Sequence, residues 1–130
     1  MNVVDNKLYE IYDNCFKQNH SIFLNKHFNL SENGIDYYNK FNIGFEFKES
    51  FRKERIVFKL VKKQLELSKY TVFNFNNEIF YMHESIYFLR KYKFKSSNYC
   101  YPSKTIIMKN PLFKTKDILK LKKYINKQRF

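Results

Sequence analysis

The run of residues from 43 to 50, Ile-Gly-Phe-Glu-Phe-Lys-Glu-Ser, alternates strictly between two kinds of position and is the strongest constraint on the fold. Side chains on a β-strand point alternately to opposite faces. Ile43, Phe45 and Phe47 therefore share one face, whereas Glu46 and Lys48 share the other. The pattern predicts a half-buried strand that carries a carboxylate and an ammonium group side by side.

A second carboxylate, Asp36, lies a short loop upstream of this strand. Residues 35–38 predict another strand, and the loop at 39–42 makes the two strands antiparallel neighbours, so that Asp36 and Glu46 converge. Two carboxylates and Lys48 can hold a divalent cation and position a water molecule, which is the minimal equipment for metal-assisted hydrolysis of a phosphodiester. An ion pair on the surface of an amphipathic strand explains the same residues equally well.

The first predicted helix offers a third carboxylate for such a metal site. Residues 7–17 have helical spacing of apolar side chains, and Glu10 lies close to the apolar face. Asp13 competes for the same role one turn further along. A solvated position on the helix surface is the ordinary alternative for Glu10.

A helix predicted from residue 54 to 68 carries polar residues that extend the candidate site. Gln64 lies inside its apolar stripe and can hold a water or a phosphate near the metal, although polar groups also occur at the edge of ordinary cores. The lysines of this helix can follow the phosphates of a nucleic acid, or they can form a solvated face. These lysines are Lys59, Lys62 and Lys63.

The charge of the chain favours polyanionic partners. Among 130 residues, 25 Lys and Arg outnumber 12 Asp and Glu, which gives a formal net charge of +13. Such an excess attracts nucleic acids, although the abundant Lys, Asn, Ile, Phe and Tyr residues also share AT-rich codons. The length fits one domain, and 44% apolar residues are enough for a core.

Cysteines and histidines give no metal site by their spacing. Cys15 and Cys100 are far apart in the sequence and are more typical of free thiols in an intracellular protein than of a single disulfide, which is the alternative. The histidines form no spaced cluster, so we assign no catalytic role to His20, His27 or His83. The start of the chain has no signal-peptide pattern and no apolar run is long enough to span a bilayer, so we expect a soluble cytoplasmic protein without a membrane partner.

The remaining segments predict an α/β sandwich with a mixed sheet. In chain order, we expect a short strand at 21–24, a hairpin of strands at 70–75 and 79–82, a short helix at 84–92, an irregular basic stretch at 93–104, and a final helix from an N-cap at Thr115 to about Gln128.

The residues around the two acids resemble a known family. Asp36-Tyr37-Tyr38, followed by Gly44-Phe45-Glu46-Phe47-Lys48-Glu49-Ser50, is similar to the active-site block of the RecU-type Holliday junction resolvases, which belong to the PD-(D/E)XK nuclease superfamily. Weaker similarity covers most of the chain. The resemblance implies a restriction-endonuclease-like fold, a mixed central sheet flanked by helices, in a single nuclease-like domain over residues 1–130.

The resemblance also implies an activity and its residues. Glu10, Asp36 and Glu46 would bind Mg²⁺, for which Mn²⁺ can substitute, and Lys48 would position or activate the attacking water. Gln64 would assist from the next helix. The implied protein is a homodimeric endonuclease that cuts branched DNA during recombination and repair.

The resemblance indicates the reaction more narrowly than it indicates the DNA substrate. The segment between the first helix and Asp36 is too short for the stalk that RecU-type enzymes insert into a junction. A restriction or homing endonuclease on the same core is therefore an alternative, and a non-catalytic basic nucleic-acid-binding protein is an alternative from a different class. For a homodimer, the candidate interfaces are the hairpin at 70–82 and the first helix.

Overall fold

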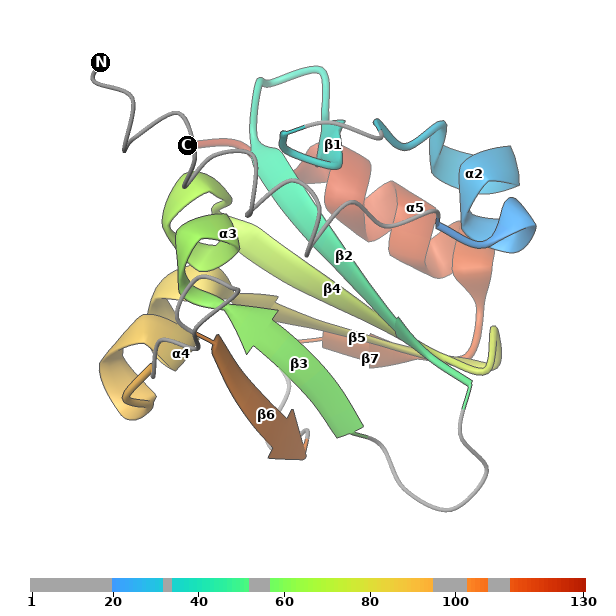
Figure 1. The fold of residues 1–130 in the computed structure, drawn as a ribbon. Helices are drawn as coiled ribbons and strands as arrows, with labels where there is room; N and C mark the ends of the chain where they lie inside the picture. Colours follow the sequence, from blue (N-terminus) through green and yellow to red (C-terminus); the bar gives the residue numbers. More distant parts are fainter. Residues whose placement is uncertain (1–19, 32–33, 52–56, 95–102, 108–112) are drawn as a thin grey trace, which may run out of the picture.

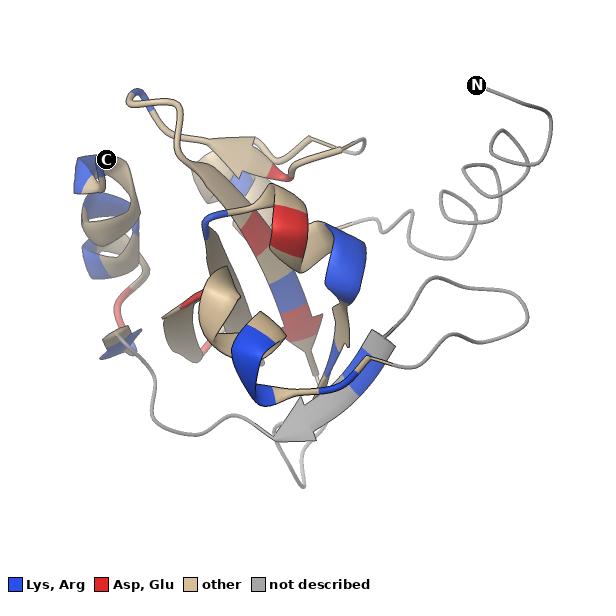
Figure 2. Ribbon diagram, turned by 90° about the vertical axis from the view of Figure 1, so that its left-hand side faces the viewer, with Lys and Arg blue, Asp and Glu red and all other residues tan. Residues whose placement is uncertain are grey.

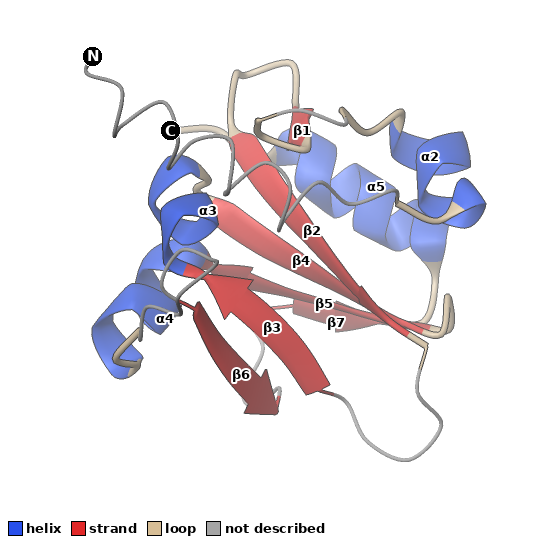
Figure 3. Ribbon diagram, viewed as in Figure 1, coloured by secondary structure: helices blue, strands red, loops and turns tan. Residues whose placement is uncertain are grey.

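The computed structural model describes residues 20–31, 34–51, 57–94, 103–107 and 113–130. In chain order, their elements are α2 (Ile22–Phe28), β1 (Tyr37–Tyr38), β2 (Gly44–Ser50), β3 (Val57–Val61), α3 (Lys62–Leu67), β4 (Tyr70–Phe75), β5 (Ile79–Glu84), α4 (Ser85–Lys91), β6 (Ser103–Ile107), β7 (Phe113–Thr115) and α5 (Ile118–Lys127). Figures 1 and 3 show a central sheet with helices on both faces and a small second sheet beside it.

The central sheet has five strands in the order β1-β2-β4-β5-β7. β2 and β4 run parallel, whereas the other neighbouring pairs are antiparallel. β3 and β6 form a separate antiparallel pair. The prediction of a mixed α/β fold, with a mixed sheet flanked by helices, is confirmed at this level.

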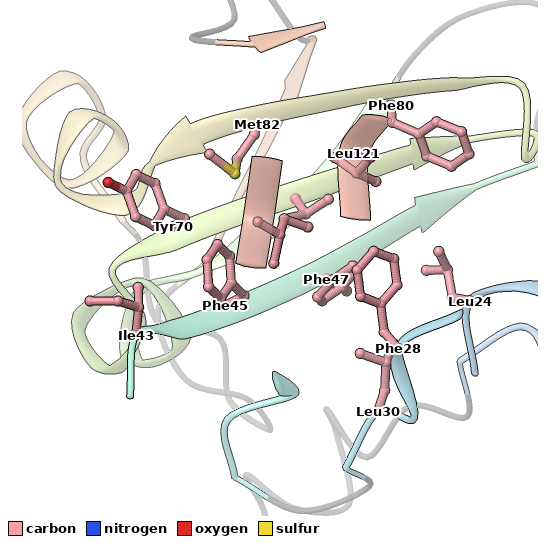
Figure 4. Close-up of a cluster of buried hydrophobic side chains, with 12 residues drawn as sticks. Leu24, Phe28, Leu30, Ile43, Phe45, Phe47, Tyr70, Phe80, Met82 and Leu121 are labelled. Carbon is pink, nitrogen blue, oxygen red and sulfur yellow. The ribbon is translucent and has the colours of Figure 1, made fainter. Parts of the chain in front are cut away.

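One face of the central sheet packs against α2 and α5 through an apolar core. Phe45 and Phe47 of β2 are fully buried there, against Leu24 and Phe28 of α2 and Leu121 of α5. Figure 4 shows these side chains meeting between the strands and the helices. Burial of each such side chain contributes about 1.5–3 kcal/mol, so this face anchors β2 firmly.

The opposite face is covered by α3, α4 and the small second sheet. Phe58 of β3, Leu65 of α3 and Phe88 of α4 pack around Phe73 of β4 in a second apolar cluster. The two clusters therefore cover both faces of the central strands.

β2 is therefore buried on both faces, and its prediction as a half-buried strand is wrong. The alternation does separate the faces, because Phe45 and Phe47 enter the apolar core. Glu46 and Lys48 point to the other face. The exposed fraction of Glu46 is 2% and that of Lys48 is 4%. β3 and α3 contact β2 on that side, which removes the two polar side chains from water.

Residues 21–24 begin a helix instead of forming the predicted strand. Ser21 is the N-cap of α2, and its hydroxyl accepts a hydrogen bond from the N–H of Leu24 at 3.2 Å. The helix ends at Asn29, which has a left-handed φ of 51°. A run of four residues is too short to distinguish the two structures by periodicity.

The helix predicted over residues 54–68 is wrong in its first half. Residues 57–61 form β3, and only Lys62–Leu67 is helical. β3 pairs with β6, which begins at Ser103, at the end of the stretch expected to be irregular. This pairing joins segments more than forty residues apart, so no local pattern predicts it.

The predicted hairpin is confirmed. β4 and β5 pair antiparallel, with Phe75 opposite Ile79. Asn76 and Asn77 at the turn have positive φ values of 54° and 58°, which asparagine tolerates better than most residues.

The helices after this hairpin also form close to their predicted bounds. α4 lies within the segment predicted to be helical at 84–92, and α5 corresponds to the predicted final helix. The N-cap of α5 is Asp117 and not Thr115, because the Asp117 carboxylate accepts the N–H of Leu119 at 2.9 Å. Thr115 is the last residue of β7, a strand that the sequence pattern did not predict.

The hairpin does not provide the predicted dimer interface. β4 and β5 lie inside the sheet, and Tyr70, Phe73, Phe80 and Tyr81 are buried within the chain. The other predicted interface, the helix at 7–17, lies outside the described residues. Within the described ranges, no helix is long and apolar enough to cross a membrane.

Candidate active site

Asp36 lies at the free edge of β2. β1 pairs only with Gly44 and Phe45, so the following residues of β2 have no strand on that side within the described residues. The Asp36 carboxylate takes the place of the missing strand, because its Oδ2 accepts the backbone N–H of Phe47 at 2.8 Å. The N–H and C=O groups of an extended residue point to the same side, so the Phe47 carbonyl faces this edge as well.

Glu46 is a buried carboxylate with an unsatisfied oxygen. Its Oε1 lies 3.8 Å from Nζ of Lys48, whereas its buried Oε2 has no hydrogen-bond partner. Burial raises the pKa of Glu46 to about 8; the Lys48 charge opposes this shift, and the neighbouring Asp36 carboxylate adds to it. An electropositive ligand is the chemical complement that this Glu46 oxygen lacks.

Lys48 is held by the amide of Gln64. Its Nζ donates a hydrogen bond to Oε1 of Gln64, and both residues are buried. Burial lowers the pKa of Lys48; Glu46 and Asp36 oppose this shift, and the charge of Lys59 adds to it. The ammonium group is thus fixed in direction and destabilised by its surroundings, a combination typical of functional lysines.

A chain of hydroxyl groups fixes the helix that carries Gln64. Ser68 donates to the carbonyl of Gln64 at 2.7 Å and lies 3.2 Å from the hydroxyl of Ser85. Ser85 in turn lies 2.8 Å from the hydroxyl of Thr71. These contacts join α3 to the first turn of α4 and to β4, so Gln64 is positioned by three elements.

His20 is a site residue that the sequence reasoning missed. Its Nε2 lies 3.0 Å from Oδ1 of Asp36, and its Nδ1 lies 3.6 Å from Oε2 of Glu49. Burial alone would lower the pKa of His20, but hydrogen bonds and charge from the two carboxylates outweigh it and raise the pKa to about 9. The adjoining Ser21 N-cap signal would have placed His20 beside a helix start, but no spacing rule links it to Asp36.

Glu49 completes the ring of contacts around His20. Besides the histidine, it accepts the N–H of Ser21 at 3.0 Å and the amide of Asn74 at 3.1 Å. Burial would raise the pKa of Glu49, but these donors outweigh it and hold the pKa below its ordinary value. The histidine therefore links Asp36 at the sheet edge to a firmly anchored carboxylate.

A hollow of about 450 Å³ opens next to Asp36. Residues 28–31 and 35–38 line it, so it lies between the end of α2 and β1. The hollow gives small molecules and ions from solvent a route to the edge where Asp36 sits.

The predicted nucleic-acid-binding lysines do not share one helix. Lys59 belongs to β3, where it is exposed, whereas Lys62 and Lys63 lie in the first turn of α3. Lys62 forms an exposed ion pair with Glu66 at 3.9 Å. Glu10 and Asp13, the alternatives for a third metal ligand, lie outside the described residues.

The donor set around Asp36 and Glu46 fits a hard divalent cation. Both are carboxylates, one oxygen of Glu46 has no partner, and the Phe47 carbonyl faces the same edge. Mg²⁺ is often held by one or two carboxylates with waters and substrate phosphates as the remaining ligands. Within the described residues, no group of three or more His, Cys, Asp and Glu is arranged to hold a metal by itself.

Comparison of the chain with protein-family models, with curated proteins and with solved structures finds no match. The geometry of the site is therefore the evidence on which a function can be proposed.

Proposed function

We propose that this protein is a metal-dependent endonuclease that hydrolyses phosphodiester bonds of DNA on a restriction-endonuclease-like core. The observation that carries the proposal is the pair of buried carboxylates, Asp36 and Glu46, beside the buried Lys48, with one Glu46 oxygen left without a partner. Buried charged groups that are poorly satisfied are costly, and they are commonly retained where they serve chemistry.

Each residue has a distinct role in this proposal. Asp36 and Glu46 hold the cation, and Mg²⁺ bound there would supply Lewis-acid polarisation of a phosphate oxygen and a more acidic water. Lys48, aligned by Gln64, orients the attacking water or stabilises negative charge that develops on the phosphate. Burial lowers the pKa of Lys48, which favours the neutral amine that can take a proton from the attacking water.

Branched DNA is the substrate that the resemblance to the RecU-type enzymes favours, cut by a homodimer with two equivalent sites. The net charge of +13 supports binding of DNA, whether branched or linear. A four-way junction has two-fold symmetry, and a symmetric dimer would place paired cuts on opposite strands.

The test is a cleavage assay on a four-way junction and on a linear duplex, with Mg²⁺, with Mn²⁺ and with EDTA. Asp36→Asn and Glu46→Gln should abolish cleavage but preserve binding, because they remove repulsion from phosphate. Lys48→Ala should slow cleavage by ~10²-fold or more at saturating DNA. Glu78→Gln, an exposed acid at the β4–β5 turn, is the matched control and should cut normally.

Two outcomes would overturn the proposal. Undiminished cleavage by both carboxylate variants would remove the site assignment. Tight DNA binding without cleavage under every metal condition would favour the non-catalytic nucleic-acid-binding protein.

A further inference from the structure

Basic and aromatic side chains gather at the end of the molecule where β2 and β4 begin. They come from the loop before β2, from the residue before β4 and from the end of α5, which lie close together in Figures 1 and 2. We call this surface the basic–aromatic platform and define it as Lys40, Phe41, Lys69, Lys127, Arg129 and Phe130.

The cations of the platform lie over aromatic rings. The guanidinium carbon of Arg129 is 4.9 Å from the ring centre of Phe41, and Nζ of Lys40 is 5.1 Å from the same ring centre. Nζ of Lys69 lies 5.3 Å from the ring centre of Phe130 and 5.5 Å from that of Tyr70. The surface therefore alternates between flat apolar faces and positive charges.

Intramolecular stability does not explain this arrangement. Lys40, Lys69, Lys127 and Arg129 are exposed, and within the described residues none of them has a carboxylate within 4.0 Å. Exposed cation–π contacts stabilise a fold only modestly, and four neighbouring positive charges repel one another. Phe130 is 89% exposed, so its ring contributes little to the core.

We propose that the platform binds an unpaired strand of nucleic acid. Unstacked bases have exposed π-faces that stack on aromatic rings and on guanidinium planes, and their phosphates pair with neighbouring cations. A duplex hides its base faces inside the stack and presents phosphates, sugars and the edges of its bases. The alternation of rings and charges thus complements a single strand better than it complements a duplex.

The platform lies next to the candidate active site. The backbone N–H of Lys69 donates to the carbonyl of Gly44 at 3.0 Å. Gly44 precedes Glu46 by two residues on β2, which corresponds to about 7 Å along a strand. A strand held on the platform can therefore continue to the carboxylates. This inference rests on the proposed nuclease function. It specifies the substrate as DNA with an unpaired segment beside the cleaved bond.

The test measures binding in EDTA, where no cleavage interferes. Fluorescence anisotropy with labelled dT20 and with a labelled hairpin duplex compares the wild type with Phe130→Ala, Phe41→Leu and Arg129→Gln. Phe41 is partly buried against the core, so Phe41→Leu keeps an apolar side chain there and removes only the aromatic ring. Leu119→Ala and Lys120→Gln are matched controls, because both residues are exposed at the other end of α5.

We expect each aromatic variant to bind dT20 between about 5-fold and 100-fold more weakly, with a much smaller change for the duplex. Arg129→Gln should lower the slope of log affinity against log salt by about 0.7 for dT20. The controls should bind as the wild type does. An rU20 arm shows whether the platform accepts DNA, RNA or both, and binding of rU20 alone would overturn the DNA assignment.

Unchanged dT20 affinity in both aromatic variants would overturn the inference, as would an equal loss in the controls. Sedimentation of Phe130→Ala tests whether a second copy of the chain occupies the platform instead. A shift from dimer to monomer without a change in dT20 binding would assign the platform to that second copy and overturn the inference. Failure of the proposed function is distinguishable, because it appears as absent Mg²⁺-dependent cleavage in a protein that still binds dT20 through the platform.

Discussion

The candidate site is built from charged residues that sit where charge is unfavourable. Asp36, Glu46 and Lys48 are each at most 7% exposed, and their charges act on one another as predicted. The strand predicted at 35–38 is shorter, because β1 covers only Tyr37–Tyr38 and Asp36 lies just before it. Their catalytic roles stay predictions. His20 was missed because its link to Asp36 joins a segment before α2 to the sheet edge, and such a contact has no period in the sequence.

The buried carboxylate of Glu46 makes the protein less stable as the pH rises. Its pKa is raised to about 8 in the folded state, so between the ordinary value and 8 the folded protein binds more protons than the unfolded chain and stability falls with pH. Glu46→Gln removes this loss. We expect the variant to unfold at a temperature about 3 °C or more above the wild type at pH 8 without metal, and near the wild type at pH 4.5.

Thermal denaturation between pH 4.5 and 8 checks this result. Added Mg²⁺ should then stabilise the wild type and leave Glu46→Gln unaffected, because a ligand that binds only the folded state raises its stability. A variant less stable than the wild type at pH 8 would contradict this account of the Glu46 environment.

The contacts of His20 also stabilise the fold less as the pH rises, but over a higher pH range than Glu46. Its pKa is raised to about 9, so its ion pairs with Asp36 and Glu49 stabilise the fold fully below pH 6.5 and are lost as the pH rises through 9. His20→Gln should therefore lower the free energy of unfolding by roughly 1–3 kcal/mol at pH 6. Urea denaturation at pH 6 and pH 9.5 measures the difference, which should shrink at the higher pH. His27→Gln is the control, and an equal effect there would show that the loss is not specific to the Asp36 contact.

At the level of elements, local signals succeeded where one segment decides its own structure. The β4–β5 hairpin, α4 and α5 follow from alternation, turn residues and helical spacing. β3 and β6 were missed because each is stabilised by the other across a long separation, and Val57–Val61 continues directly into the helical residues of α3. The helical interpretation of this segment placed Lys59 on the wrong element, yet its charge still acts on Lys48.

The start of α5 tests how far a single capping residue controls an element. Asp117 accepts the N–H of Leu119 at 2.9 Å, and its own N–H donates to the hydroxyl of Thr115 at 3.0 Å. Asp117→Ala should cost about 1 kcal/mol of unfolding free energy, whereas Thr115→Val should cost less because it leaves the cap carboxylate in place. Urea denaturation of both variants checks the order, and a larger loss for Thr115→Val would restore Thr115 as the cap.

At the level of the whole molecule, the sheet order explains why the site sits beside β2. β1 pairs with only the first two residues of β2, and among the described residues the next part of this edge is where Asp36, the Phe47 backbone and His20 meet. The sequence indicated the two strands that meet there, but not the layer of β3 and α3 that buries Glu46 and Lys48. That layer depends on contacts between distant segments, so the burial and the pKa shifts that follow from it were beyond sequence patterns.

The net positive charge of the whole molecule determines how its affinity for DNA should depend on salt. If the net charge of +13 serves DNA binding and about 6 lysine–phosphate contacts form, log affinity for a duplex should fall with log salt at a slope of about −5. Removing two phosphate contacts with Lys59→Gln and Lys63→Gln should reduce the slope by about 2. The same removal at Lys116 and Lys120, which lie near the start of α5, should change the slope less, because α5 packs on the face of the sheet opposite to β3 and α3. A flat response to salt would instead attribute the excess of lysine to codon composition and separate it from DNA binding.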